Sequence, residues 1–266
     1  MKGTQASLGC ARVARSLSLA RFHPPSIIRP VAAPISITWL GHSTFIIGLP
    51  SGKRVLTDPW LGNPSCPKAY SKADALKPLD VIIVSHGHSD HLSDAAAVSR
   101  ATGAPVVCMF EVGLYLTDKG LQSVRDMGIG GTQTVAGVTI TMTTALHSGS
   151  IVDNGHIVYL GGAAGFILRA PDMPTIYFAG DTGLFGDMKV IAEVYQPQIA
   201  FLPIGDLYTM GPDTAAIAAR WLGVRQVVPM HWGTFPVLTG TPQALREHLK
   251  GSNVEVLELK PGEKAQ

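Results

Sequence analysis

Cysteine is scarce in this chain, and no long apolar run is present. The three cysteines, Cys10, Cys66 and Cys108, lie far apart and form no Cys-x-x-Cys pair. This usage indicates neither a disulfide framework nor a thiolate zinc site, and it fits a reducing compartment. No apolar run reaches the length of about 18 residues that a membrane-spanning helix needs, so we expect no transmembrane segment.

Acidic residues are absent before Asp58, whereas residues 1–34 contain five of the 21 Lys and Arg residues. This N-terminal extension is also rich in Ser and has Val13, Leu17 and Ala20 at helical spacing. Such a composition is typical of an organelle transit peptide, which would place the protein in mitochondria or plastids. A disordered basic tail or a start codon assigned too far upstream explains the segment equally well, and we would then expect a cytoplasmic protein.

Residues 35–266 carry the remaining 16 Lys and Arg residues against 19 Asp and Glu residues, which is a slight acidic excess. A surface that binds nucleic acid is therefore not expected. The whole chain has 46% hydrophobic residues, 29 Gly and 19 Pro, a composition typical of a loop-rich globular protein. We expect residues 35–266 to form one domain, and the sequence leaves open whether it forms a homo-oligomer.

Short β-rich stretches begin this domain. The stretches "ISITWL", "TFIIGL" and "KRVLTD" predict antiparallel strands, and the unbroken apolar "DVIIVSH" predicts a strand covered on both faces. From "TIYFAGD" onward strands alternate with helices, so we expect an α/β fold with two sheets packed on each other and helices outside. Residues 148–165 lack periodicity and are predicted to form a long Gly-rich loop, which either closes over a substrate or only connects two strands.

The predicted C-terminal helices have distinct boundary signals. Pro212 and Pro242 are expected in first helical turns, and Thr241 is expected to be an N-cap. Gly223 and Gly251 are expected to end the two helices.

Four predicted buried strands end on a side chain that can bind a metal ion. These side chains are His86, Asp181, Asp206 and His231. Ligands of open α/β sheets bind beyond the carboxyl ends of the strands, so we expect these side chains to surround one site. Chance explains one or two such endings more easily than four.

The densest group of candidate ligands is the stretch "VSHGHSDH", residues 84–91. His86 and His88 follow a strand and can point the same way, while Asp90 and His91 can face a second point nearby. Zinc is bound tetrahedrally by four donors at about 2.0–2.2 Å, which this stretch alone cannot supply compactly. It can contribute to two neighbouring sites, because hydrolases hold metal pairs about 3.5–4 Å apart. The candidates for the remaining ligands are His147, Asp181 and His231.

The motif His-x-His-x-Asp-His, followed by a His, an Asp and a His at strand ends, resembles the metallo-β-lactamase-fold hydrolases. Longer stretches such as "WLGHSTFII", "LTDPWLGNP", "AGDTGLFGDMKVIAEVY" and "MHWGTFPV" resemble the UPF0173 metal-dependent hydrolase family. The similarity runs from about Ile35 to the C-terminus. The wider group includes an ascorbate-6-phosphate lactonase and an N-acylphosphatidylethanolamine phospholipase D. The resemblance implies a four-layer αββα metallo-β-lactamase sandwich with mixed sheets.

The resemblance also implies two divalent metal ions, in the first place Zn, with Mn or Fe as alternatives. The implied ligands are His86, His88 and His147 for one ion, Asp90, His91 and His231 for the other, and Asp181 as a bridge. The stretch "MHWGTF" departs from the family, whose members commonly carry Tyr-Asn after the ligand. This departure puts substrate contacts in doubt, not metal binding.

The expected activity is that of a dinuclear hydrolase, in which a metal-bridging hydroxide attacks an ester, lactone or phosphodiester bond of a small molecule. Asp90, His42 and Asp206 are the candidate catalytic residues, for orienting the water, contacting the substrate or protonating the leaving group. Asp58 is a candidate to accept a hydrogen bond from a ligand histidine. The structural alternatives are a hairpin hydrogen bond for His42, a loop cap for Asp206 and a turn residue for Asp58.

Two other activities remain alternatives on the same fold. An iron-dependent oxidoreductase is one, although His88 favours two filled metal positions. An RNA-processing nuclease is the other, although the acidic excess of residues 35–266 argues against it.

Overall fold

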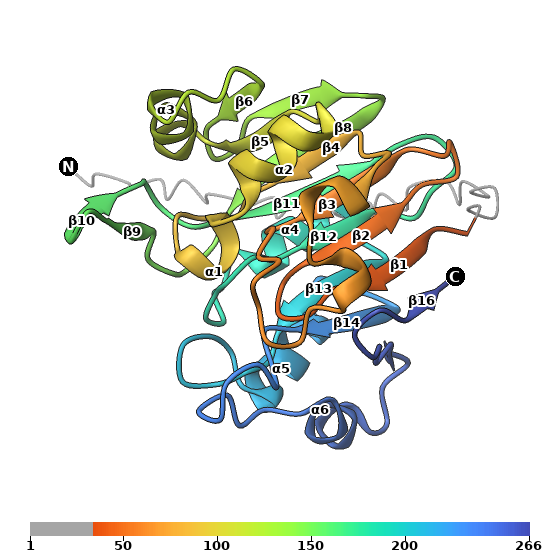
Figure 1. Cartoon of the computed structure of the whole chain (residues 1–266). Coiled ribbons are helices and arrows are strands. Elements are labelled where there is room, and N and C mark those ends of the chain that lie inside the picture. The colour runs from red at the N-terminus through yellow and green to blue at the C-terminus, as the bar shows by residue number, and fades with distance from the viewer. Residues whose placement is uncertain (1–33) are drawn as a thin grey trace, which may run out of the picture. The chain divides into compact units, whose positions relative to one another are not determined.

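The computed structural model describes residues 34–266 (Figure 1). The predicted extension, residues 1–34, lies outside this part of the chain except for Pro34, so the transit-peptide interpretation stays a prediction. Cys66 and Cys108 are free thiols, and Cys10 lies outside the described residues. None of the helices in the described part is long and apolar enough to cross a bilayer.

The first sheet has seven strands in the order β16-β1-β2-β3-β4-β5-β6. Its strands are β1 (Ser36–Trp39), β2 (Phe45–Gly48), β3 (Arg54–Thr57), β4 (Val81–Ile83), β5 (Val106–Met109), β6 (Val124–Met127) and β16 (Lys264–Ala265). The pairs from β16 to β3 are antiparallel, and those from β3 to β6 are parallel. The predicted antiparallel strands are therefore confirmed. So is the predicted buried strand, β4, whose three residues are fully buried.

The second sheet also has seven strands, in the order β15-β14-β13-β12-β11-β8-β7. Its strands are β7 (Thr132–Val135), β8 (Val138–Thr144), β11 (Ala164–Arg169), β12 (Ile176–Phe178), β13 (Ile199–Pro203), β14 (Gln226–Met230) and β15 (Glu255–Val256). The pairs from β7 to β12 are antiparallel, and those from β12 to β15 are parallel. Both sheets are thus mixed.

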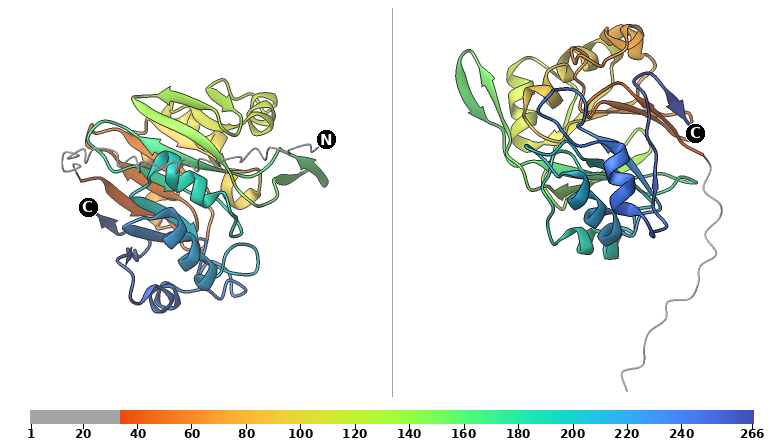
Figure 2. Two further views of the ribbon diagram at one scale, coloured as in Figure 1. Left: turned by 180° about the vertical axis from the view of Figure 1, so that it is seen from behind. Right: turned by 90° about the horizontal axis from the view of Figure 1, so that it is seen from below.

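Except for the single turn α1, the helices lie on the outer faces of the two sheets (Figure 1). They are α1 (Ser89–Leu92), α2 (Ala95–Thr102), α3 (Phe110–Asp118), α4 (Met188–Tyr195), α5 (Pro212–Leu222) and α6 (Pro242–Leu249), with 3-10 turns η1 (Lys68–Tyr70) and η2 (Ala73–Leu76). Helices α2 and α3 contact the first sheet, while α5 and α6 contact the second, with α4 beside α5 (Figure 2). The predicted four-layer αββα sandwich is therefore confirmed.

The predicted helix boundaries agree with the structure. The Thr241 side chain accepts a hydrogen bond from the Ala244 amide at 3.1 Å, and Pro212 and Pro242 occupy first turns. Gly223 ends α5 in the left-handed conformation that favours glycine (φ 66°). Gly251 has the same kind of conformation and follows Lys250, the C-cap residue of α6.

Residues 148–165 differ from the predicted loop. They include a β-hairpin of β9 (Ser150–Asp153) and β10 (His156–Tyr159), which forms its own two-stranded sheet and projects from the sandwich in Figure 1. The turn is made by Asn154 and Gly155, which both have positive φ. An Asn-Gly pair is the preferred sequence for such a turn, so the missed signal was present in the sequence.

The seam between the two sheets is filled by aromatic side chains. The rings of Phe45 on β2 and Phe201 on β13 meet edge to face with centroids 5.0 Å apart, and Phe178 packs against Phe201 at 6.0 Å. All three side chains are fully buried. Hydrophobic burial at this seam therefore joins the sheets.

We expect Phe201→Ala to lower the free energy of unfolding by about 3–5 kcal/mol, because it opens a cavity at the seam of the sheets. Urea denaturation of both proteins measures the change. Phe110→Ala is the matched control, since Phe110 is about half exposed on α3 and its loss is expected to cost less than about 1 kcal/mol. Equal effects of the two substitutions would contradict the assignment of the seam as the centre of the core.

Candidate metal centre

The candidate ligands gather at one edge of the sandwich, because strands that run in the same direction end there. His86 follows β4, His147 follows β8, Asp181 follows β12 and His231 follows β14. Strand β8 runs in the same direction as β12, since both pair antiparallel with β11. His86 follows a strand of the first sheet, and the other three side chains follow strands of the second sheet. Both sheets therefore contribute side chains to this edge.

The short helix α1 presents the remaining candidate ligands of the first sheet. His88 is its N-cap residue, and Asp90 and His91 lie within its single turn. Between His86 and His88 the chain passes close to Leu160, and a Cβ atom at Gly87 would lie 2.8 Å from the Leu160 side chain. Glycine is therefore the residue that lets the two histidines turn toward the same point.

Three histidines form the first group. His86 Nε2 lies 2.9 Å from His88 Nδ1, and His147 Nε2 lies 3.3 Å from the same His88 atom. One nitrogen from each ring lies within 4.8 Å of the others. These three nitrogens can therefore bind one cation together.

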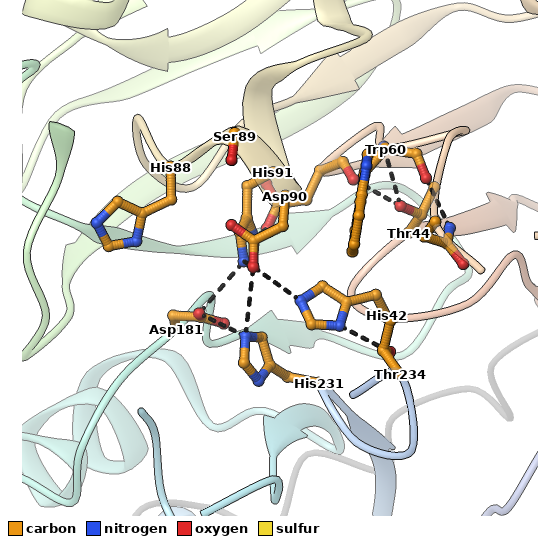
Figure 3. A network of polar contacts seen from close by, with 12 residues as sticks. His42, Thr44, Trp60, His88, Ser89, Asp90, His91, Asp181, His231 and Thr234 are labelled. Atoms are coloured by element: carbon orange, nitrogen blue, oxygen red, sulfur yellow. Dashed lines mark hydrogen bonds and ion pairs between the residues drawn. The ribbon is translucent and has the colours of Figure 1, made fainter. Parts of the chain in front are cut away.

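Asp90, His91 and His231 belong to the second group, in which Figure 3 shows the side chains converging on the two carboxylates. Asp90 Oδ2 lies 3.7 Å from His91 Nε2 and 3.8 Å from His231 Nε2. His42 completes this group, with Nε2 at 3.1 Å from Asp90 Oδ2. The second group can likewise bind a cation.

Asp181 lies between the two groups. Its Oδ2 atom is 3.0 Å from His231 Nε2 and 3.2 Å from His91 Nε2, and it is 3.8 Å from His147 Nε2 in the first group. Asp181 Oδ1 and His91 Nε2 are buried and form no hydrogen bond with any residue of the described range, 34–266. Buried polar atoms are rarely left without a partner, and His86, His91 and Asp181 can hold a metal ion together, so these atoms fit residues that bind a cation.

The charges of the centre also favour a cation. Burial opposes ionisation, but His231 and His91 outweigh it and hold the pKa of Asp181 well below its ordinary range. In turn Asp181 overcomes the burial of His231 and raises its pKa to about 9. The carboxylates therefore attract positive charge, as protons on the histidines or as a metal ion that replaces those protons.

Asp58 orients one histidine of each group, His91 by direct contact and His86 through Ser85. Its Oδ2 atom lies 2.7 Å from His91 Nδ1 and accepts a hydrogen bond from Ser85 Oγ at 2.7 Å, while Oδ1 accepts from the Ser85 amide at 2.7 Å. Ser85 Oγ lies 2.9 Å from His86 Nδ1. These contacts fix the ring orientation and tautomer of His91 and His86, as ligand histidines require.

Ser85 was not among the predicted site residues. It precedes His86 directly, and a hydroxyl next to a candidate ligand was the signal available in the sequence. Thr234 was missed in the same way, three residues after His231. Its Oγ1 atom lies 2.9 Å from His42 Nδ1, so it orients the His42 ring.

His42 lies in the turn between β1 and β2 and is fully buried. Burial lowers its pKa to about 4, against the hydrogen bond to Asp90. The neutral ring therefore donates from Nε2 to Asp90 and accepts from Thr234 at Nδ1. Both ring nitrogens of His42 are therefore hydrogen-bonded. The buried ring lies behind Asp90 and not at the surface where a substrate arrives.

We expect His42→Ala to retain its metal ions and to lower the activity about 10–100-fold, because Asp90 loses the hydrogen bond that orients it. Metal analysis and a hydrolysis assay on the same preparation test this. Loss of one ion per chain in this variant would show instead that His42 Nε2 coordinates a metal.

Asp206 is not brought into either group. It is exposed in the loop after β13, where its amide donates to the Met210 carbonyl at 3.0 Å and its carbonyl accepts from the Thr209 amide at 3.2 Å. These contacts match the alternative of a loop cap. A direct role of Asp206 in catalysis stays a prediction.

The stretch "MHWGTF", which begins at the last residue of β14, also has a structural role. Trp232 stacks on Trp39 with ring centroids 5.2 Å apart, and its Nε1 donates to the Pro229 carbonyl at 3.3 Å. Its side chain therefore packs against the end of β1. The ring centroid of Phe235, three residues later, lies 6.0 Å from that of His42 and 5.7 Å from that of Trp60.

Comparison with known proteins agrees with this geometry. Residues 53–232 match the family model described as the beta-lactamase superfamily domain. A UPF0173 metal-dependent hydrolase of Solibacter usitatus is 50% identical over 233 residues, which cover 87% of this chain and 100% of the relative. One from Koribacter versatilis is 46% identical over 230 residues, covering 86% and 97%.

Among solved structures, Igni18, a metallo hydrolase from the hyperthermophilic archaeon Ignicoccus hospitalis, is similar with a TM-score of 0.77 and 34% identity. The similarity covers 87% of this chain and 97% of Igni18. The chain therefore belongs to the UPF0173 family of metal-dependent hydrolases, within the beta-lactamase superfamily.

Proposed function

We propose that this hydrolase uses two divalent ions, in the first place zinc, to cleave an ester, lactone or phosphodiester bond of a small molecule. The observation that carries the proposal is the position of Asp181 Oδ2, which lies within 3.8 Å of a histidine of the first group and within 3.2 Å of two histidines of the second. A carboxylate in this position fits a bridge between two ions. Nitrogen and oxygen donors without a thiolate suit zinc and also manganese or iron.

When bound, divalent ions lower the pKa of a coordinated water and polarise the oxygen of the bond under attack. The side chains of the protein orient the attacking water. Asp90 is the carboxylate on the open side of the centre, and its hydrogen bond from His42 aims Oδ2 toward the ligands (Figure 3). In that position it accepts a hydrogen bond from the attacking water and turns the lone pair of the water toward the substrate.

The overall reaction adds one water across the bond. The water oxygen bonds to the acyl carbon or phosphorus, the bond to the leaving group breaks, and one proton of the water passes to the leaving oxygen. Membership in a family of hydrolases favours this reaction over the iron-dependent oxidoreductase and the RNA-processing nuclease.

Removal and return of the metal tests the proposal. We expect dialysis against a chelator to abolish hydrolysis of p-nitrophenyl acetate, and two equivalents of Zn²⁺ or Mn²⁺ per chain to restore it. Rebinding should also raise the midpoint of thermal unfolding, because a ligand that binds only the folded state stabilises that state. Full activity after chelation would contradict metal dependence, and full activity with a single equivalent would contradict the dinuclear site.

A further inference from the structure

We propose that the substrate is a neutral ester or lactone whose acyl group is apolar. This inference rests on the proposed function, because it concerns the part of the substrate that lies beside the reacting bond. It narrows the bond types that the metal centre alone would allow.

The open side of the metal centre is defined by the exposure of its ligands. The side chains of Asp90 and His147 are 26% and 14% exposed, and His88 is also partly exposed. The other four candidate ligands are buried, with His86 and His91 fully inaccessible. A substrate therefore approaches over Asp90, His88 and His147.

Apolar side chains lie on the loops around this opening, and we call them the apolar rim. The rim consists of Trp60, Leu146, Leu207, Tyr208 and Phe235. Leu146, Leu207 and Tyr208 are 60–62% exposed, Phe235 is 38% exposed and Trp60 is partly exposed. Each rim residue lies in a segment that follows the carboxyl end of a strand or the ligand that ends it.

Backbone contacts tie the rim to the ligands. Leu146 precedes His147, and its amide donates to Thr182 Oγ1 at 2.9 Å, next to Asp181. The loop of Leu207 and Tyr208 is fixed at both of its ends. The Met210 amide donates to the Thr182 carbonyl at 3.0 Å, and a Cβ atom at Gly205 would meet the His231 carbonyl.

The other side of the rim is held by aromatic contacts. The ring of Phe235 stacks on Trp60 with centroids 5.7 Å apart, and Trp60 meets His42 edge to face at 5.2 Å. His42 in turn bonds to Asp90. The rim therefore reaches the metal centre from both sheets.

Cations are missing from the segments that surround the centre. No Lys or Arg occurs in residues 40–44, 58–66, 145–149, 179–187 or 204–211. The same holds for the ligand segment, residues 84–94, and for residues 231–240 after β14. The first cation after Asp181 is Lys189, whose Nζ lies 4.3 Å above the Trp221 ring.

A charged acyl group would therefore have no partner at the rim. Burying an unpaired carboxylate or phosphate is unfavourable, and sites for such groups usually supply Arg or Lys in addition to any metal. The exposed charged side chains of these segments are Asp187 and Asp206, which repel an anion. A neutral apolar group gains from burial against the rim instead.

Exposure of apolar residues alone would not carry this inference. Phe110, Leu114 and Val194 are also about half exposed or more, and isolated apolar residues are normal on protein surfaces. The rim differs because it surrounds an opening to ligands and because the same segments lack cations. Together, the apolar rim and the lack of cations favour a substrate with a neutral, apolar acyl group.

A set of p-nitrophenyl esters with one leaving group tests the proposal on the Zn²⁺-loaded full chain. We expect kcat/KM for the hexanoate to exceed that for the acetate by about tenfold or more, since the added methylenes are buried on the rim. For the anionic hemisuccinate, kcat/KM should be at least about tenfold below that for the butyrate of equal chain length, because its charge is unpaired. Bis(p-nitrophenyl) phosphate should be the poorest substrate of the set.

Leu207→Lys provides the second measurement, because it places an ammonium group on the rim. We expect the ratio of kcat/KM for hemisuccinate over hexanoate to rise about tenfold or more, because the ammonium group can pair with the carboxylate of the hemisuccinate. Val194→Lys is the matched control: it adds the same charge at an exposed position of α4, and its ratio should equal that of the unsubstituted protein.

Two kinds of failure are distinguishable. If no ester, including the acetate, is hydrolysed in a metal-dependent way, the proposed function fails. If metal-dependent hydrolysis occurs but hemisuccinate or the phosphodiester equals the hexanoate, or Leu207→Lys leaves the ratio unchanged, the proposed substrate class is wrong while the function stands.

Discussion

Replacing His88 with Ala is expected to remove one metal ion per chain and to lower hydrolysis at least about 10³-fold, because one metal supplies several kcal/mol of transition-state stabilisation. His88 Nδ1 lies 2.9 Å from His86 Nε2 and 3.3 Å from His147 Nε2, so its loss leaves the first group with two nitrogens. Metal analysis by mass spectrometry and the acetate assay measure both effects on one sample.

The matched control is His248→Ala, since His248 is exposed on α6 and belongs to neither group. It should keep both ions and full activity. An active His88→Ala enzyme with two ions per chain would overturn the assignment of the first group.

Asp58→Asn is expected to weaken metal binding about 10–100-fold, the usual effect of changing a group that orients a ligand histidine. Asp58 accepts hydrogen bonds at both oxygens, and an amide nitrogen in place of Oδ2 would face the donors of His91 Nδ1 and Ser85 Oγ. His91 would then change tautomer and present an N–H group to the metal position. Competition with a chromogenic chelator measures the affinity.

Asp80→Asn provides the control for this change. Asp80 also accepts a backbone hydrogen bond, from the Arg54 amide at 2.9 Å, but it lies before β4 instead of after β3. We expect a small loss of stability and unchanged metal affinity. If the Asp58→Asn variant retains the full metal affinity, Asp58 stabilises the fold but does not orient the ligand histidines.

The sequence predicted the location of the candidate ligands because their positions depend on the direction of strands. His86, Asp181 and His231 each follow a buried strand, and buried apolar runs are readily recognised. Parallel strands then bring their ends to one edge. The assignment of individual ligands to each ion rests on the family resemblance, and metal analysis of the His88→Ala variant tests it.

Other features depended on contacts that no local pattern encodes. The hydrogen bonds of Ser85 and Thr234 join segments 27 and 192 residues apart, to Asp58 and His42. Helix α3 was not predicted because it follows β5 without an intervening loop, so apolar residues run from one element into the next. Asp206 ends a buried strand as the ligands do, but a backbone turn with positive φ keeps it in the exposed loop.

The two layers of strands meet in a seam, and the metal centre straddles the edge of that seam. His86 and Asp90 come from one layer, while His147, Asp181 and His231 come from the other. A cation there has high affinity only when the layers are docked, so its binding free energy resists their separation. A bound ion would therefore hold the two layers together, and we expect proteolysis that requires the layers to separate to slow as the cation concentration rises.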